Sequence, residues 1–299
     1  MRWDDLRRST NIEDRRGSGG IPGGAGGLGI GTVLILGLVG WALGIDPRIL
    51  IGGAEILTGN SESYTRPAER TSTGNTPSDQ AGQFVAAVLG DTEDRWQEIF
   101  QAAGRQYKAP RLVMFSGVTN SACGMAQSAM GPFYCPNDRR VYLDTAFFRD
   151  LENRFGGCEG KACQFAQAYV IAHEIGHHVQ NLLGVLPEVQ RTQQQLSGPE
   201  GNRLQVKVEL QADCFAGVWA NRAQARWNLF EPGDVEAALQ TASAIGDDRL
   251  QKRTQGRVVP DAFTHGSSAQ RVHWFTSGLK NGSTSGCNTF DTETVGRGP

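Results

Sequence analysis

Residues 172–178, AHEIGHH, contain the pattern H-E-x-x-H inside a run of sequence that is typical of a helix. Residues i and i+4 of an α-helix share one face, so His173 and His177 can both present an imidazole nitrogen to a single metal ion. Glu174 lies about 100° further round the helix, where a carboxylate can reach a metal-bound water without binding the ion. The alternative is an ordinary amphipathic helix whose histidines are satisfied by hydrogen bonds.

A second helix-like run, residues 204–223, carries Glu209 and Asp213 at the same i, i+4 spacing. A catalytic zinc ion has three protein ligands and leaves its fourth position to water, so the two histidines need a third donor. Glu209 is the candidate for that ligand, and Asp213 is expected to accept a hydrogen bond from the non-ligating nitrogen of His173. Gly217, on the same face, is expected to let this helix pack closely against the histidine helix. A solvent-facing acidic pair is the alternative, although the surrounding residues are mostly apolar.

A third stretch, THGSSAQRV at residues 264–272, places a histidine in a loop before a helix. Ser267 or Ser268 is the expected N-cap of a short helix that ends at Gly278. A loop imidazole at His265 is well suited to donate a hydrogen bond to the oxyanion of a tetrahedral intermediate, and a structural histidine is the alternative. The two remaining histidines are expected to be structural or surface residues: His178 and His273.

The overall charge excludes one class of function. The formal net charge is −2 and the isoelectric point is near 6.2, so the chain offers no basic field for nucleic acid. A hydrophobic content of 39% with 20% charged residues is compatible with a folded domain. We therefore expect no nucleic-acid partner.

The N-terminal region has the composition of a membrane anchor. Residues 1–16 are polar and carry five arginines, no charged residue occurs in residues 17–45, and residues 28–45 are almost continuously apolar. The sequence predicts a single transmembrane helix at residues 26–45, which is about long enough to cross a bilayer. The positive-inside rule then predicts a cytoplasmic basic N-terminus at residues 1–16 and a periplasmic or extracellular location for the rest of an inner-membrane protein. A cleaved signal peptide and a buried glycine-rich hairpin are the alternatives.

After the apolar run, residues 46–79 are rich in Gly, Ser, Thr, Asn and Pro and are predicted to be a flexible linker. The folded domain is predicted at residues 80–295. It is expected to begin with a helix capped by Asp79, followed by a second helix over residues 91–103 and a strand at residues 111–117.

Six cysteines follow the apolar run, and for a domain outside the cytoplasm they predict disulfides rather than a metal site. Six cysteines allow fifteen connectivities. The pairs closest in sequence are Cys123 with Cys135 and Cys158 with Cys163, which leaves Cys214 with Cys287.

The order H-E-x-x-H and then E-x-x-x-D resembles the thermolysin-like gluzincin metallopeptidases. The fuller pattern is similar to a bacterial family of neutral zinc metallopeptidases with one N-terminal membrane anchor: HEIGHH at 173–178, ELQADCFAGVWA at 209–220 and THGSSAQR at 264–271. It is also similar to membrane-bound heat-shock and prenyl-protein metalloproteases, which carry E-x-x-A-D and a later Ser/Thr-His-Pro with an Arg six residues after that histidine. This chain has Gly266 in place of that proline. The resemblance covers roughly residues 80 to 290.

The resemblance implies an α+β, zincin-like metallopeptidase domain with a small β-sheet and an H-E-x-x-H helix, preceded by one transmembrane helix. In zincins of this kind an edge strand upstream of the zinc helix binds the substrate backbone. Residues 140–143 alternate like a strand, so Val141, Tyr142 and Leu143 are the candidates for substrate binding, and an internal hairpin of the small sheet is the alternative.

These observations predict a membrane-anchored, Zn²⁺-dependent endopeptidase that acts on proteins or peptides. His173, His177 and Glu209 would bind the zinc ion, Glu174 would be the general base, His265 the oxyanion donor, and residues 26–45 would contact the lipid bilayer. The alternative is a membrane-anchored, catalytically inactive zincin-fold binding or scaffold protein.

Overall fold

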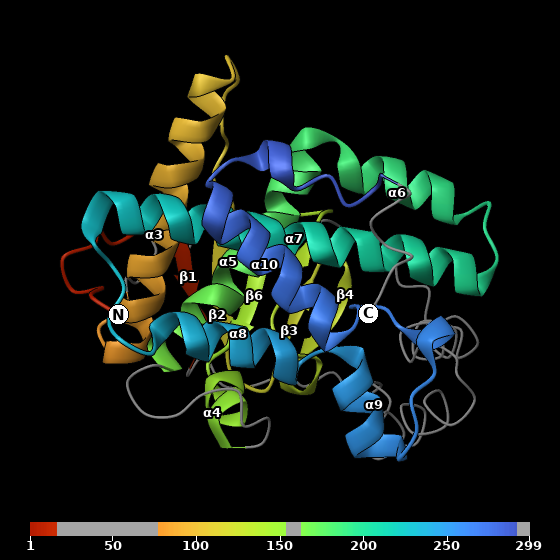
Figure 1. Ribbon diagram of the computed structural model, residues 1–299. Helices are drawn as coiled ribbons and strands as arrows, with labels where there is room; N and C mark the ends of the chain where they lie inside the picture. The colour runs from red at the N-terminus through yellow and green to blue at the C-terminus, as the bar shows by residue number, and fades with distance from the viewer. Residues whose placement is uncertain (17–76, 154–162, 292–299) are drawn as a thin grey trace, which may run out of the picture. The chain divides into compact units, whose positions relative to one another are not determined.

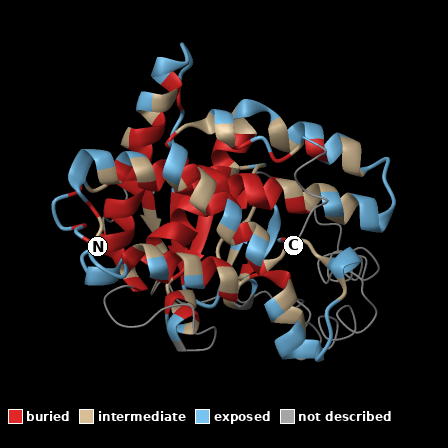
Figure 2. Ribbon diagram, in the orientation of Figure 1, coloured by how far each residue is buried: buried red, intermediate tan, exposed pale blue. Residues whose placement is uncertain are grey.

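A computed structural model describes residues 1–16, 77–153 and 163–291 of the chain. These residues belong to one compact unit, in which a four-stranded sheet lies against a set of helices (Figure 1). The predicted α+β class is confirmed. The buried residues gather where the long helices meet one another and the sheet (Figure 2).

The sheet has the strand order β1 (Ile12–Asp14), β2 (Arg111–Phe115), β6 (Arg140–Asp144) and β5 (Phe133–Cys135). The pairs β1 with β2 and β2 with β6 are parallel, whereas β5 runs antiparallel to β6 at the end of the sheet. A separate antiparallel hairpin joins β3 (Val118–Ser121) to β4 (Gly124–Gln127).

The prediction of an edge strand at residues 141–143 is wrong, because β6 is paired on both sides. Val141 and Leu143 face the large hydrophobic core, while Tyr142 belongs to a smaller cluster on the other face of the sheet. Strands that are covered on both faces have nearly continuous apolar sequences, which explains the sequence VYL. The edge strand on this side of the sheet is β5.

Helix α3 (Gln80–Ala102) follows Asp79, whose side chain accepts a hydrogen bond from the backbone N–H of Gly82, as the sequence predicts for an N-cap. The predicted break between two helices does not occur, and the helix is continuous across Gly90. A β-carbon at Gly90 would lie 2.3 Å from the backbone oxygen of Arg7. This glycine therefore makes room for the N-terminal segment and does not end the helix.

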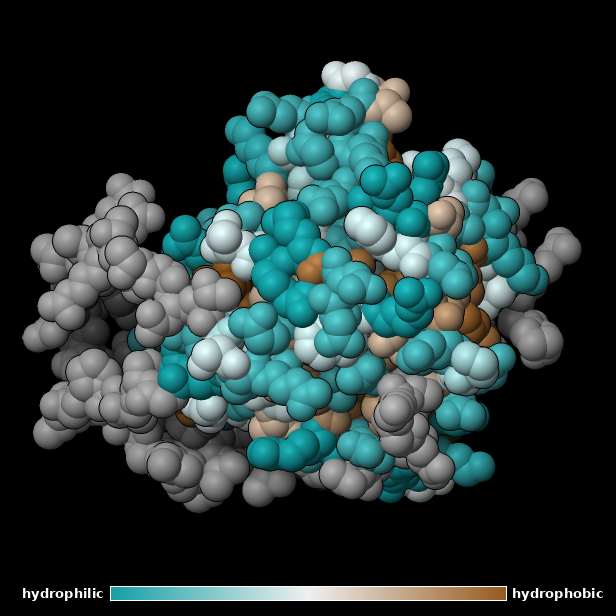
Figure 3. All heavy atoms as spheres, turned by 90° about the vertical axis from the view of Figure 1, so that its left-hand side faces the viewer, coloured by the Kyte–Doolittle hydropathy of each residue, from teal (hydrophilic) through white to brown (hydrophobic). Residues whose placement is uncertain are grey.

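Residues 1–16, predicted as a basic N-terminal segment outside the domain at residues 80–295, are part of this folded unit. Met1, Trp3, Leu6 and Ile12 are buried in the main core. The backbone N–H of Ser9 donates to the carbonyl of Ala86 at 2.9 Å, and strand β1 continues the sheet through its pairing with β2. The side of the molecule where the N-terminus lies is mainly hydrophilic, with apolar atoms in small separate areas (Figure 3).

Three helices hold the centre of the unit: α5 (Cys163–Leu183), α7 (Gly198–Trp227) and α10 (Ser268–Asn281). Capping boxes mark the starts of two of these helices. Ser197 with Glu200 caps α7, and Ser267 with Gln270 caps α10. The described residues also form the α-helices α4 (Ala146–Asn153), α6 (Val185–Gln193), α8 (Asp234–Ala244) and α9 (Asp247–Gln255).

Glycines allow the three central helices to approach closely. A β-carbon at Gly176 of α5 would lie 2.9 Å from the carbonyl oxygen of Ala212 in α7. A β-carbon at Gly217 would lie 2.2 Å from the carbonyl oxygen of Phe275, and one at Gly278 would lie 2.0 Å from that of Cys214. Gly217 therefore packs α7 against α10, and the close approach of α7 to the histidine helix that was expected at Gly217 occurs at Gly176 of α5.

Two of the expected disulfides are present, Cys123 with Cys135 and Cys214 with Cys287. The third expected pair includes Cys158, which lies outside the described residues. The predicted transmembrane helix at residues 26–45 and nearly all of the predicted linker at 46–79 also lie outside them. Among the helices of the described ranges, none combines the length and apolar character that a membrane crossing needs.

Candidate metal centre

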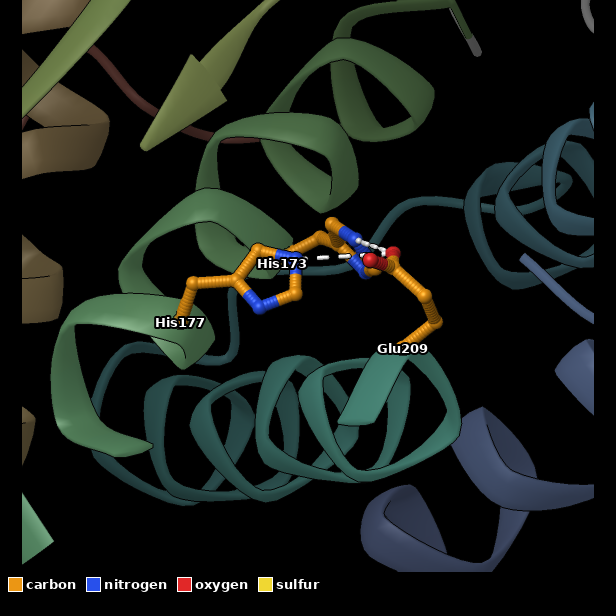
Figure 4. A group of neighbouring side chains, drawn as sticks. All are labelled: His173, His177 and Glu209. Atoms are coloured by element: carbon orange, nitrogen blue, oxygen red, sulfur yellow. Dashed lines mark hydrogen bonds and ion pairs between the residues drawn. The ribbon is translucent and has the colours of Figure 1, made fainter. Parts of the chain in front are cut away.

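Helix α5 places His173 and His177 one turn apart, with both rings directed toward α7 (Figure 4). The ring centroids are 4.8 Å apart. Glu209 reaches the same point from α7. The Nε2 atom of His173 lies 3.2 Å from Oε2 of Glu209, and the Nε2 atom of His177 lies 3.5 Å from the same oxygen.

The three side chains fit a zinc ion. Two imidazole nitrogens and one carboxylate oxygen are a common donor set for catalytic zinc, and one ligand atom from each residue lies within 4.8 Å of the other two. Two atoms that are each about 2.0–2.1 Å from a tetrahedral zinc ion are about 3.3–3.4 Å apart. The measured separations of 3.2 and 3.5 Å agree with that value.

Asp213 orients the first histidine. Its Oδ1 atom accepts hydrogen bonds from Nδ1 of His173 at 2.8 Å and from the hydroxyl of Tyr169 at 2.6 Å. Arg271 of α10 donates from Nε to Oδ2 at 2.8 Å and from a terminal nitrogen to Oδ1 at 2.9 Å. The contact between Asp213 and His173 was expected from the sequence, whereas no role was predicted for Tyr169 or Arg271.

Glutamines support the other two candidate ligands. The Oε1 atom of Gln180 lies 2.9 Å from Nδ1 of His177. The Nε2 atom of Gln205 donates a hydrogen bond to Oε1 of Glu209 at 2.9 Å. Sequence reasoning missed both residues. The available signal was spacing, because Gln180 follows His177 by three residues and Gln205 precedes Glu209 by four, so each pair shares a helix face.

The charges of the centre are strongly coupled. Burial alone would raise the pKa of Asp213, but the charge of Arg271 and then that of His173 lower it to about 2. Burial would likewise raise the pKa of Glu209, yet the charge of His177 and the hydrogen bonds from both histidines hold it well below its ordinary value. For His173, burial acts to lower the pKa, and Asp213 followed by Glu209 raise it to about 10. The carboxylates are therefore ionised at neutral pH and present negative charge to a cation.

Glu174 follows His173 on α5, and only 7% of its surface is exposed. Its carboxylate has no hydrogen-bond or ion-pair partner within residues 1–16, 77–153 and 163–291. A buried carboxylate beside three metal-ligand candidates, with no competing partner, is suited to accept a proton from water.

Asp247 of α9 shapes the loop that carries His265. Its Oδ2 atom accepts from the backbone N–H groups of Thr264, His265 and Gly266 at 2.7, 2.6 and 3.0 Å. Gly266 has φ +89°, and proline can supply neither this angle nor the N–H group. This explains why the chain can have glycine and not proline at this position. The side chain of His265 is about half exposed, and Asp247 lies 3.3 Å from its Nδ1 atom.

His178 has a structural role, as expected. Its Nε2 atom lies 2.7 Å from the carbonyl oxygen of Lys108, and its Nδ1 atom lies 3.0 Å from the hydroxyl of Tyr134 in β5. Burial lowers the pKa of His178 to about 4, so the ring is neutral at neutral pH. It donates to Lys108 and accepts from Tyr134, and it thereby ties the zinc helix to the edge strand. His273 is exposed, as expected.

Two histidines and a glutamate brought together by a pair of helices are the donor set of the zinc metallopeptidase class. The sequence model of the family described as "Putative neutral zinc metallopeptidase" matches residues 1–290, and the chain belongs to that family. The resemblance to the neutral zinc metallopeptidases is thereby confirmed.

Two relatives show how far the similarity extends. The chain is 46% identical over 300 residues to Uncharacterized protein YpfJ of Escherichia coli strain K12. The aligned region covers 97% of this chain and 99% of that protein. The chain is 40% identical over 263 residues to Uncharacterized protein Rv2575 of Mycobacterium tuberculosis strain H37Rv, which covers 85% of this chain and 86% of the relative. No solved structure matches the chain.

Proposed function

We propose that this protein is a zinc-dependent metalloendopeptidase that hydrolyses peptide bonds of proteins or peptides. The observation that carries the proposal is the convergence of Nε2 of His173 and Nε2 of His177 on one oxygen of Glu209. Both Nδ1 atoms are engaged elsewhere, by Asp213 and Gln180, so both Nε2 atoms are directed to the same point.

The residues around the centre can divide the work of hydrolysis. His173, His177 and Glu209 would hold the ion, which when bound supplies a Lewis acid and a water of lowered pKa. Glu174 takes a proton from the attacking water and later delivers it to the leaving amine. His265 donates a hydrogen bond to the oxyanion of the tetrahedral intermediate.

The free edge of β5 is the proposed site for the substrate backbone. β5 is paired with β6 on one side, and no strand among the described residues pairs with its other side. Tyr134 in β5 is joined to α5 through His178 and through Asn181, whose amide donates to the tyrosine hydroxyl at 2.9 Å. A peptide added to this edge would gain main-chain hydrogen bonds at a strand that is fixed to the zinc helix.

The proposed activity is tested with the purified full chain and denatured casein. We expect cleavage that stops when 1,10-phenanthroline removes zinc and returns when zinc is added, because the three candidate ligands and Glu174 must act together. Glu174→Gln protein purified in parallel controls for contaminating proteases. Stoichiometric zinc binding without cleavage of casein or of a mixed peptide library would refute the proposal in favour of an inactive scaffold.

We further propose that residues 1–16 and the zinc domain lie together in an oxidising compartment, such as the periplasm. The disulfides Cys123–Cys135 and Cys214–Cys287 support the compartment. The pairing of β1 with β2 supports a location of both segments on the same side of the membrane. A single membrane crossing by residues 26–45 would place the two strands on opposite sides. Contact of residues 26–45 with lipid remains part of the proposal, but the predicted cytoplasmic N-terminus does not.

This arrangement is tested by labelling spheroplasts with a membrane-impermeant maleimide. Thr10 and Gln255 are both exposed, so Thr10→Cys and Gln255→Cys are matched reporters of the N-terminal segment and of the domain. We expect both variants to react before the membrane is opened. Protection of the Thr10 variant alone would show that β1 leaves the sheet in the membrane-bound protein, and protection of both would place the domain in the cytoplasm.

A further inference from the structure

Gln180 is buried on α5, with no exposed surface, and its side-chain amide lies between the metal centre and α7. Its Nε2 atom donates to the carbonyl oxygen of Val208 at 2.8 Å and to Oε1 of Gln211 at 3.0 Å. Its Oε1 atom lies 2.9 Å from Nδ1 of His177. Every polar atom of the amide thus has a partner.

The orientation of this amide follows from the chemistry of its partners. A backbone carbonyl can only accept a hydrogen bond, so the NH₂ group of Gln180 must face Val208. Gln211 is fixed in the same way, because its Nε2 atom donates to the carbonyl oxygen of Cys287 at 3.1 Å, which leaves Oε1 to accept from Gln180. Two backbone carbonyls therefore determine the direction of the whole chain of hydrogen bonds.

The oxygen of Gln180 must consequently face His177, and an oxygen acceptor requires a proton on Nδ1 of that ring. In the neutral imidazole the lone pair is then on Nε2, the atom that lies 3.5 Å from Glu209. We propose that Gln180 is a positioning residue that holds His177 in the Nδ1-protonated tautomer, so that Nε2 is available to zinc. The inference rests on the proposed zinc site and does not require peptidase activity.

The test measures zinc affinity by competition with a chromophoric chelator, in the full chain. Gln180→Met has a similar length but no acceptor, and we expect it to weaken zinc binding about 10–100-fold, as is usual when the partner of a ligating histidine is lost. Gln180→Glu keeps an oxygen for Nδ1, so its zinc affinity should stay closer to the wild-type value than that of Gln180→Met. Gln224→Met is the matched control, because Gln224 lies fifteen residues beyond Glu209 on α7 and should leave zinc affinity unchanged.

A purely structural role for Gln180 predicts a different pattern. The metal-free Met and Glu variants would then unfold at lower temperature, while zinc affinity per folded molecule stayed equal to that of the wild type, and this result would overturn the inference. Nitrogen NMR of the zinc-loaded wild type supplies a second readout, in which His177 should show a protonated Nδ1, and ligation through Nδ1 would also overturn it. Failure of the wild type to bind zinc would instead refute the proposed metal site itself.

Discussion

Glu174→Gln is expected to lower kcat/KM for peptide hydrolysis by about 10²–10⁴-fold, the usual contribution of a general acid–base group. The amide has nearly the same shape as the carboxylate but cannot accept a proton from water. Because Glu174 has no hydrogen-bond or ion-pair partner among the described residues, the substitution breaks no hydrogen bond or ion pair there. Zinc content and thermal stability should therefore match those of the wild type, and the loss should appear mainly in kcat.

Glu209→Ala is the companion variant, and it should lose zinc as well as activity because one of three ligands is removed. The two variants separate loss of the general base from loss of the metal ion. Metal-loaded Glu174→Gln protein that still turned over substrate would show that another group is the base. Unchanged zinc stoichiometry in Glu209→Ala would show that the third ligand is a different residue.

Asp213→Ala is expected to have the largest effect on stability. The substitution leaves the guanidinium of Arg271, whose side chain is only 3% exposed, without its carboxylate partner. Loss of one member of a buried ion pair costs about 3–5 kcal/mol, which corresponds to a fall in Tm of roughly 6–20 °C for a domain of this size. The measurement uses urea or thermal unfolding of the metal-free protein, so that zinc loss does not contribute.

A double-mutant cycle isolates the interaction. Removal of the guanidinium as well, in Asp213→Ala with Arg271→Met, should restore much of the lost stability, because no unpaired charge then remains in the core. Zinc affinity should stay low in the double variant, since His173 still lacks its acceptor. A free energy of unfolding for Asp213→Ala within about 1 kcal/mol of the wild type would contradict this account. Asp213→Asn provides the comparison if the alanine variant does not fold.

Helical periodicity is the reason that much of the centre was predictable. The i, i+4 spacing alone places His173 with His177 and Glu209 with Asp213, and the capping residues Asp79 and Ser267 locate the starts of two helices. These signals are local, since they depend on residues within two turns of one another. The order of the two motifs then suggested that the helices meet.

The parts that sequence reasoning missed depend on contacts between distant segments. Strand β1 is only three residues long, and it is defined by pairing with β2 about a hundred residues later. Residues 140–143 have the composition of a strand, but nothing in four residues tells whether a partner lies on one side or both. Gln180 has the right spacing from His177, yet its role became visible only when Val208 and Gln211 fixed the direction of its amide.

The contacts of Gly176, Gly217 and Gly278 have a consequence for how this centre could change over time. The candidate ligands, the carboxylate behind them and the arginine are carried by three helices whose separation is set by main chain against main chain. The frame is therefore independent of which side chains stand at positions 173, 177 and 209. Different donor sets could be exchanged there, by selection or by design, and would inherit the same spacing. A methyl group at Gly176 would instead move the two histidines away from Glu209, and one at Gly217 or Gly278 would move Arg271 away from Asp213.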